Sequence, residues 1–143
     1  MPLWGTCMGF QLLNILTSGN WSILDRNVYL SENQSLPLSL TSSASHSHIF
    51  GQMPEHIVNI FAHENVTVNL HHDGLPPNSF KADPHLNQFY RMIATNQDRV
   101  GREYVSFIEA YEYPIYGVQF HPGNHEHNIL HSYHISFPFL SLT

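Results

Sequence analysis

The stretch LWGTCMGFQLL, Leu3 to Leu13, decides the fold, because it joins a short apolar run to a helix-like segment through a turn that holds the chain's one cysteine. Leu3 and Trp4 are typical of the end of a strand. From Met8 to Thr17 apolar residues recur at helical intervals, and Ser18-Gly19 then ends the pattern. The sequence therefore predicts a strand, a turn and a helix, in that order.

Cys7 occupies the centre of Gly5-Thr6-Cys7-Met8-Gly9, a G-x-C-x-G pattern. Such a pattern is typical of a nucleophile elbow, in which a sharp turn projects the reactive atom above the sheet edge. We expect the two glycines to make the turn possible, the helix N-terminus to lower the pKa of the thiol, and the backbone N–H of Met8 to face a developing oxyanion. The alternative is a packed, unreactive cysteine.

A second apolar stretch, YPIYGVQFHP, runs from Tyr113 to Pro122 and predicts a buried strand over 115–120 that delivers His121 at a sheet edge. A thiol nucleophile needs a base that takes its proton and later returns it to the leaving amine. A histidine at the carboxyl end of a second strand could meet Cys7 in that role. The alternative is a surface histidine at a strand end, since the chain has 12 histidines.

The segments between these anchors predict further helices and strands. Trp21 to Ser45 is interpreted as short strands joined by loops, and Pro54 is expected to begin a short helix. The loop from His71 to Pro77 leaves its histidines free to face a ligand. Further strands are expected where Val66, Val68 and Leu70 alternate with polar residues, and over 91–95 and 104–108 around a turn at Asn96-Gln97-Asp98.

Composition limits the classes of function. The chain has 143 residues, 42% of them hydrophobic, which predicts one globular domain. A net charge of −6 argues against nucleic acid or an anionic membrane surface as a partner, because no basic patch is present to meet phosphates. No apolar run is long enough to span a membrane, and MPLWGTCMGF lacks the basic region and apolar core of a signal peptide.

Two further features concern the compartment. A single cysteine excludes a disulfide within the chain. Three sequons, at Asn20, Asn33 and Asn65, are compatible with a chain that passes through a secretory route.

LWGTCMGFQLL together with EAYEYPIYGVQFHP closely resembles the γ-glutamyl hydrolase family, in the class I glutamine amidotransferase-like superfamily. The Trp-Gly-Thr-Cys elbow and the Tyr-Pro-Ile-Tyr-Gly approach are like those of the hydrolase branch. The similarity continues through Asn69-Leu70-His71 and Ala94-Thr95-Asn96, and covers about residues 2–122. It implies an α/β fold, namely the C-terminal part of a flavodoxin-like, class I glutamine amidotransferase-like three-layer sandwich whose N-terminal strands are missing.

The resemblance also implies residue roles and an activity. The family's nucleophile falls on Cys7, its catalytic histidine on His121, and a histidine near the substrate on His71. The implied activity is hydrolysis of γ-glutamyl bonds in folylpoly-γ-glutamates, without a metal or other cofactor, in a lysosome, in a vacuole or after secretion. The resemblance is also compatible with a homodimer.

The chain departs from the family in two ways. Gly123 stands where the family has a glutamate that orients the histidine, and Glu126 is the nearest substitute. The family also has a further half-domain before the elbow, whose absence would leave a central strand unpaired. We therefore interpret residues 1–122 as a partial hydrolase domain, from a partial gene model or splice product, and residues 123–143 as an atypical, poorly structured tail.

Three other functions remain open on the sequence. The first is a catalytically impaired binding remnant of the same family that keeps the folate-polyglutamate cleft. The second is a glutaminase component of the superfamily, although no synthetase domain accompanies it. The third is a metal-binding protein that uses the histidines of the tail, whose spacing matches no standard zinc site: His125, His127, His131 and His134.

Overall fold

The first and last strands of the structure are neighbours in one sheet. In this computed structural model, which describes residues 1–122, β1 (Leu3–Thr6) pairs in parallel with β7 (Ile115–Val118). β7, β6 (Glu103–Ala110), β5 (Tyr90–Gln97) and β3 (Ser39–Leu40) then pair antiparallel, and the sheet order is β1-β7-β6-β5-β3. The sheet is therefore mixed, with β1 at one edge and β3 at the other.

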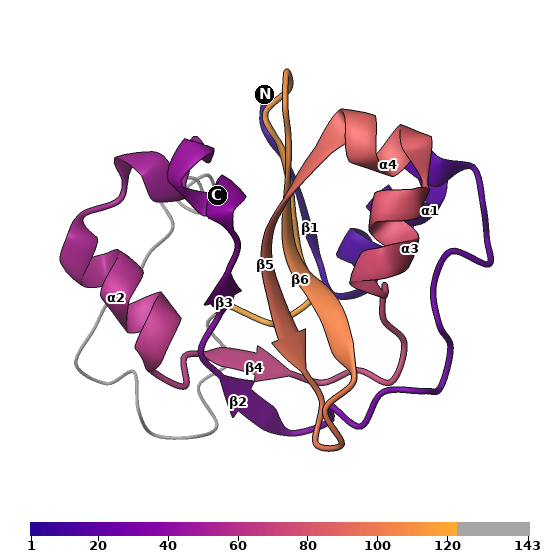
Figure 1. The fold of residues 1–143 in the computed structure, drawn as a ribbon, viewed down its shortest axis with the longest axis horizontal. Helices are drawn as coiled ribbons and strands as arrows, with labels where there is room; N and C mark the ends of the chain where they lie inside the picture. The colour runs from indigo at the N-terminus through magenta and orange to yellow at the C-terminus, as the bar shows by residue number, and fades with distance from the viewer. Residues whose placement is uncertain (123–143) are drawn as a thin grey trace.

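Helices cover both faces of this sheet. Figure 1 shows α1, α3 and α4 on one side of the strands and α2 on the other. A separate two-stranded ladder joins β2 to β4. The remaining elements are α1 (Met8–Ser18), β2 (Gln34–Leu36), the 3₁₀ helices η1 (Ser42–His46) and η2 (Phe50–Gln52), α2 (Glu55–His63), β4 (Thr67–Asn69), α3 (Pro77–Ala82) and α4 (Pro84–Phe89).

Each face of the sheet has its own hydrophobic core. Phe107 and Val118 pack in one cluster with residues of η2 and α2, whereas Ile108 packs in a second cluster with Phe10 of α1 and Leu86 of α4. Adjacent residues of a strand point to opposite faces, so a strand between two helical layers is apolar on both. The predicted three-layer α/β architecture is confirmed.

A buried carboxylate ties the chain after β3 to the centre of the sheet. Glu109 of β6 is fully buried and accepts hydrogen bonds from Ser47 Oγ at 2.6 Å and from the backbone N–H of His48 at 2.8 Å. Nδ1 of His48 lies 3.0 Å from the carboxylate and Nη1 of Arg91 lies 3.5 Å from it. These contacts hold the η1–η2 segment against the sheet.

Two expectations about secondary structure differ from the structure. The turn expected at Asn96-Gln97-Asp98 lies further on, because β5 continues to Gln97 and the side chain of Asp98 then accepts from the N–H groups of Val100 and Arg102. The expected loop from His71 ends where α3 begins at Pro77, and α3 and α4 lie in a segment for which the sequence predicts no element. Between Trp21 and Ser45 the strands are confined to β2 and β3, and Ser42 begins η1.

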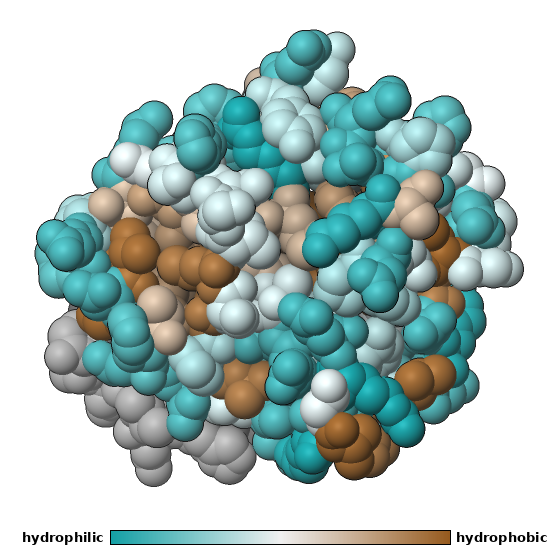
Figure 2. Space-filling view, viewed as in Figure 1, coloured by the Kyte–Doolittle hydropathy of each residue, from teal (hydrophilic) through white to brown (hydrophobic). Residues whose placement is uncertain are grey.

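The tail interpreted as poorly structured, 123–143, lies outside the described residues. Of the helices within residues 1–122, none is long and apolar enough to cross a membrane. The surface seen in Figure 2 is mainly hydrophilic, with brown groups at the left where Figure 1 places α2.

Candidate active site

Cys7 forms the turn between β1 and α1. Its φ of 51° and ψ of −104° lie outside the usual regions for a residue with a side chain. The backbone N–H of Cys7 donates to the carbonyl of Val118 at 2.8 Å, and its carbonyl accepts from the N–H of Gln11 at 3.0 Å. A strained backbone of this kind persists where neighbouring structure holds it, and it is common at functional sites. The predicted strand, sharp turn and helix are all present.

The two glycines of the elbow differ in what they do. A Cβ on Gly5 would lie 2.7 Å from the carbonyl carbon of Gly9 and 2.8 Å from Cδ1 of Leu13, so only glycine allows β1 to approach α1 this closely. A Cβ on Gly9 would meet no atom within 4 Å. The expectation that both glycines make the turn possible is therefore correct for Gly5 and wrong for Gly9 in the described part of the chain.

The thiol of Cys7 is half-buried and has two hydrogen-bond donors. Nε2 of Gln119 lies 3.7 Å from Sγ, and the backbone N–H of Met8 also donates to the sulfur. Burial raises the pKa of the thiol above its ordinary value, because it disfavours the thiolate, and the two donors oppose this only in part. The expectation of a lowered thiol pKa is wrong, since burial outweighs the helix N-terminus.

His121 lies just beyond the strand that neighbours β1. β1 and β7 are parallel with Thr6 opposite Val118, so Cys7 and His121 both follow carboxyl ends at the same edge of the sheet. The backbone N–H of His121 donates to the carbonyl of Val68 at 2.8 Å, which fixes where the chain leaves β7. Within residues 1–122 no hydrogen bond joins the imidazole to the thiol. The catalytic role of His121 stays a prediction.

His71 is buried, not free to face a ligand as its loop position suggested. Its side chain is 4% exposed, Nδ1 donates to the carbonyl of Asp73 at 2.8 Å, and Nε2 lies 3.3 Å from Oδ1 of Asn69. The pKa of His71 is lowered to about 4, chiefly by burial and in part by the nearby imidazoles of His72 and His121, although the hydrogen bond to the Asp73 carbonyl opposes this. His71 is therefore neutral at mildly acidic pH.

A chain of polar contacts links the thiol to His71. Gln119 is fully buried; its Nε2 faces Sγ of Cys7, and its Oε1 accepts from Nε2 of Gln11 at 3.3 Å. The same amide of Gln11 donates to the carbonyl of Asp73, which also accepts from His71. The sequence alone assigns no role to either glutamine. The one signal it offers is a polar residue, Gln119, between the apolar neighbours of a buried strand.

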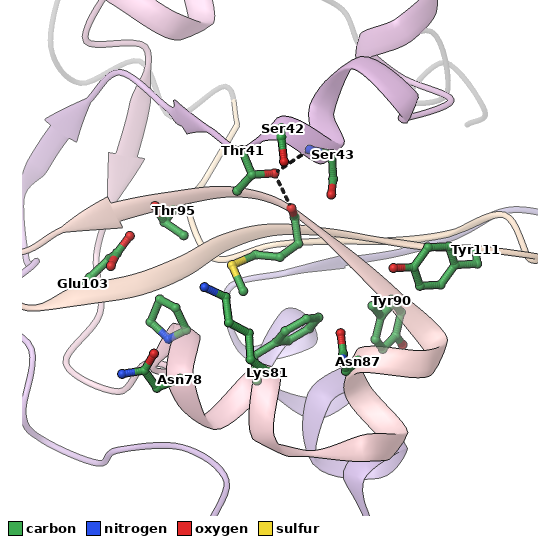
Figure 3. A pocket seen from close by; sticks show the side chains of 13 residues that line it. Thr41, Ser42, Ser43, Asn78, Lys81, Asn87, Tyr90, Thr95, Glu103 and Tyr111 are labelled. Atoms are coloured by element: carbon green, nitrogen blue, oxygen red, sulfur yellow. Dashed lines mark hydrogen bonds between the residues drawn. The ribbon is translucent and has the colours of Figure 1, made fainter.

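A separate pocket of about 340 Å³ lies between η1, α3 and β5. Figure 3 shows the Lys81 side chain extending into this pocket, with the hydroxyl of Tyr111 and the carboxylate of Glu103 at its sides. Cys7, His71 and His121 are not among the residues that line it. The pocket is thus distinct from the site around the thiol.

No metal site is found in the described part of the chain. Within residues 1–122 no group of three His, Cys, Asp or Glu side chains is placed to hold an ion. The histidines considered as zinc ligands, along with Gly123 and Glu126, lie outside these residues: His125, His127, His131 and His134.

Comparison with known proteins places this geometry in a family. The curated relatives include γ-glutamyl hydrolase B of Dictyostelium discoideum, 40% identical over 121 residues, and the γ-glutamyl hydrolases of Mus musculus and Homo sapiens, each 35% identical over 122 residues. These matches cover 85% of this chain but only 34% to 37% of each relative. The chain therefore spans about a third of the length of the curated relatives it matches.

A solved structure supports the fold. A Thermoplasma acidophilum protein described as one of the subunits of GMP synthase superposes with a TM-score of 0.51 at 18% identity, covering 84% of this chain and 47% of that one. The family model described as peptidase C26 matches residues 1–123. The chain therefore belongs to the peptidase C26 family, as its elbow and its second anchor predict.

Proposed function

We propose that this chain carries the nucleophile of a γ-glutamyl hydrolase and that Cys7 performs the chemistry. The observation that carries the proposal is the conformation of Cys7, held with a positive φ between β1 and α1 and beside the end of β7. The names of the matched relatives support the reaction class. The chain spans only about a third of those relatives, so the proposal concerns the part of the enzyme that bears the thiol.

The proposed reaction is acyl transfer through a thioester. Sγ of Cys7 attacks the γ-amide carbonyl carbon, the C–N bond breaks, and His121 gives a proton to the departing nitrogen. Water, deprotonated by His121, then attacks the thioester and releases Cys7. Because burial raises the pKa of the thiol, Cys7 is protonated at mildly acidic pH. The attack thus requires transfer of the thiol proton to His121 instead of a resting thiolate.

Two other residues have proposed roles at the reacting centre. The backbone N–H of Met8 donates to the thiol in the resting state. It would donate to the oxyanion once the sulfur has bonded to the carbonyl carbon. His71 would contribute a neutral imidazole near the substrate, because its pKa of about 4 keeps it uncharged. Both ring nitrogens of His71 already face partners, Asp73 and Asn69, so its proposed role is to shape the site without repelling a protonated His121.

We also propose folylpoly-γ-glutamates as the substrate and a lysosome, a vacuole or the cell exterior as the place of action. The asparagines of the three sequons are exposed, which glycosylation in a secretory route requires: Asn20, Asn33 and Asn65. The chain's net charge of −6 repels a substrate with several carboxylates from the surface as a whole. We therefore expect such a substrate to bind in a dedicated site.

The test measures glutamate release from a folylpoly-γ-glutamate at mildly acidic pH by the chain and by its Cys7→Ala and His121→Asn variants. We expect both variants to lose at least about a hundredfold in turnover, because each removes one half of the nucleophile and base pair. His63→Asn, at an exposed position of α2, is the control and should leave turnover unchanged. Turnover that persists in Cys7→Ala would contradict the proposal, and tight binding with no turnover would identify a binding remnant.

A further inference from the structure

The pocket between η1, α3 and β5 lies where the edge of the sheet is incomplete. β3 ends at Leu40, which pairs with Ala94, so no described strand lies outside the first residues of β5, Tyr90–Met92. η1 and α3 flank this stretch instead and enclose a volume of about 340 Å³ (Figure 3). Ligand pockets of proteins begin at about this size, and a few polar groups in them fix the ligand. The pocket therefore has room for a small molecule.

Lys81 brings an unpaired positive charge to this pocket. It is the one lysine of the sequence, and Figure 3 shows its side chain extending into the pocket from α3. Within residues 1–122 its ammonium group makes no hydrogen bond or ion pair, although the chain has 11 acidic residues. Each of the arginines, by contrast, donates to a carbonyl or a carboxylate: Arg26, Arg91, Arg99 and Arg102. The charge of Lys81 is thus free to meet a ligand.

Further polar side chains of the pocket make no hydrogen bond within residues 1–122. They come from η1 and from the two short helices: Ser42, Ser43, Asn78 and Asn87. Figure 3 shows the serines on one side of β5, with Lys81 and the asparagines on the other. Thr41 differs, because its hydroxyl already donates to the carbonyl of Met92 at 2.6 Å. Hydroxyls, primary amides and an ammonium group together are the donors that the oxygens of an anion require.

The floor of the pocket is apolar. Phe80 and Tyr90 are buried, and Met92 also lines the pocket. Tyr111 is 40% exposed at the wall, and the guanidinium of Arg91 lies 4.8 Å from the centroid of its ring and holds the ring in place. An exposed ring that is fixed in this way offers a surface on which a flat apolar group stacks. A matching ligand has an apolar body as well as oxygens that accept hydrogen bonds.

The charges of the pocket limit such a ligand to one negative group. Glu103 also lines the pocket, and within residues 1–122 no ion pair joins it to Lys81. Figure 3 shows Glu103 and Tyr111 on opposite sides of Lys81. A second anionic group would be repelled by this carboxylate and by the net charge of −6, whereas a single one balances the charge of Lys81. This excludes a phosphate dianion or a chain of several carboxylates as the preferred ligand.

We infer that this pocket binds an organic monocarboxylate with an aromatic body, whose carboxylate accepts hydrogen bonds from Lys81 and the two serines and whose ring contacts Tyr111. The site is separate from the chemistry proposed for the thiol, because Cys7 and His121 do not line it. Binding is measured without hydrolysis, so failure of this inference and failure of the proposed function are distinguishable.

The test is a titration of the 143-residue chain with 3-phenylpropanoate at pH 7, followed through the backbone amide signals by NMR. We expect saturable shifts centred on the amides of Ser42, Ser43 and Lys81, with a Kd on the order of 1 mM for a ligand of this size. At about ten times that concentration the ligand should also raise the Tm of the chain by about 4 °C, because it binds only the folded state.

Related molecules separate the parts of the ligand. 3-Phenylpropanamide lacks the charge, whereas acetate and inorganic phosphate lack the ring, and each should bind at least about tenfold more weakly. Benzylmalonate carries a second carboxylate and should bind no more tightly than 3-phenylpropanoate. Equal affinity for the amide would overturn the inference, because the site would then not recognise charge. Equal affinity for acetate or phosphate would overturn it as well, because the site would then bind any small anion.

Variants locate the contact. Lys81→Gln should weaken binding of 3-phenylpropanoate at least about tenfold, whereas Lys81→Arg keeps the charge and should stay within about threefold. Glu103→Gln should tighten binding of benzylmalonate at least about threefold, because it removes the competing carboxylate. Arg26→Gln is the matched control: it removes the same charge from a residue that does not line the pocket, and it should bind 3-phenylpropanoate unchanged.

Three other results would contradict the inference. They are the absence of saturable shifts at about ten times the expected Kd, equal affinity in Lys81→Gln, and shifts centred on Cys7 and His121, which would place the ligand at the thiol. If broad signals prevent the NMR titration, the rise in Tm of the original chain and its loss in Lys81→Gln test the same contact; an equal rise in both, or none in the original chain, would count against the pocket.

Discussion

The two edges of the five-stranded sheet are built differently. β3, at one edge, is two residues long, follows Pro37 and continues into η1, which Glu109 ties to the centre of the sheet. β1, at the other edge, carries no charged residue and has no further strand beside it within residues 1–122. Natural sheets protect an edge with short strands, prolines, charges or covering loops. β3 thus has the features of an edge that faces solvent, whereas β1 has those of an interior strand.

The largest effect should come from removing Glu109, which anchors the segment after β3 at the first of these edges. Glu109→Leu leaves the Ser47 hydroxyl and the His48 N–H without their acceptor and Arg91 without its carboxylate, so we expect the free energy of unfolding to fall by about 4 kcal/mol. Urea unfolding followed by circular dichroism measures it. Glu112→Leu, at an exposed position, is the control. A loss below about 1 kcal/mol would show that the β3 edge does not depend on Glu109.

The next effect tests how β1 is held to α1. Gly5→Ala places a Cβ 2.7 Å from backbone atoms of Gly9, which cannot move aside, so we expect a loss of about 3 kcal/mol in the free energy of unfolding. Gly9→Ala meets no atom and should instead stabilise the isolated chain, by about 0.5 kcal/mol. The same urea titration measures both. If the two variants behave alike, the close approach of β1 to α1 is not what requires Gly5.

A pH effect of intermediate size comes from His71, whose ring packs against Tyr104 of β6. Its pKa is about 4 when folded and about 6.5 when unfolded, so the unfolded chain binds the proton more tightly. The stabilisation is fully present above pH 6.5 and is lost as the pH falls toward 4; at pH 5 the loss is about 2 kcal/mol.

His71→Asn should remove that part of the pH dependence, because the variant has no group that titrates in this range. Urea unfolding at pH 7 and pH 5 measures the difference for the original chain, for His71→Asn and for His56→Asn, a control on the exposed side of α2. An unchanged difference in His71→Asn would assign the pH dependence to other groups.

The smallest effect should come from the outer side of α1, beside the β1 edge. Leu16 is 66% exposed and Leu16→Ala should change the free energy of unfolding of the isolated chain by less than about 0.5 kcal/mol. The adjacent Ile15 is 7% exposed, and Ile15→Ala should lower it by about 3 kcal/mol. Equal losses in the two variants would show that the outer side of α1 is already covered in the isolated chain.

Much of the fold follows from local pattern. Helical spacing and Ser18-Gly19 predict α1 nearly to its last residue, and Pro54 marks the beginning of α2. α3 and α4 escape prediction because six residues are too few to show a helical period, and their proline starts resemble a turn. The predicted hairpin turn is misplaced because Asp98, not Asn96, accepts the backbone hydrogen bonds that shape it.

The candidate site is only partly readable from sequence. The elbow pattern and the strand end are local features that make Cys7 and His121 candidates, and the family resemblance supplies their predicted roles. The contact between Gln119 and the thiol depends on the pairing of β1 with β7, which no local pattern gives. The direction of the thiol pKa likewise depends on burial in the folded chain, and for that reason the helix N-terminus alone predicts the opposite sign.

The pairing of β1 with β7 also has a consequence during synthesis. Leu3 pairs with Ile115, so the partner of β1 within residues 1–122 is synthesised only after roughly 110 more residues have been added. At about 5–20 residues per second this takes on the order of ten seconds. An apolar segment without charge is then open to chaperones for the whole interval, because its partner strand is the last of the sheet to be translated. Translation speed, as well as stability, would therefore govern how much of this polypeptide reaches its native pairing.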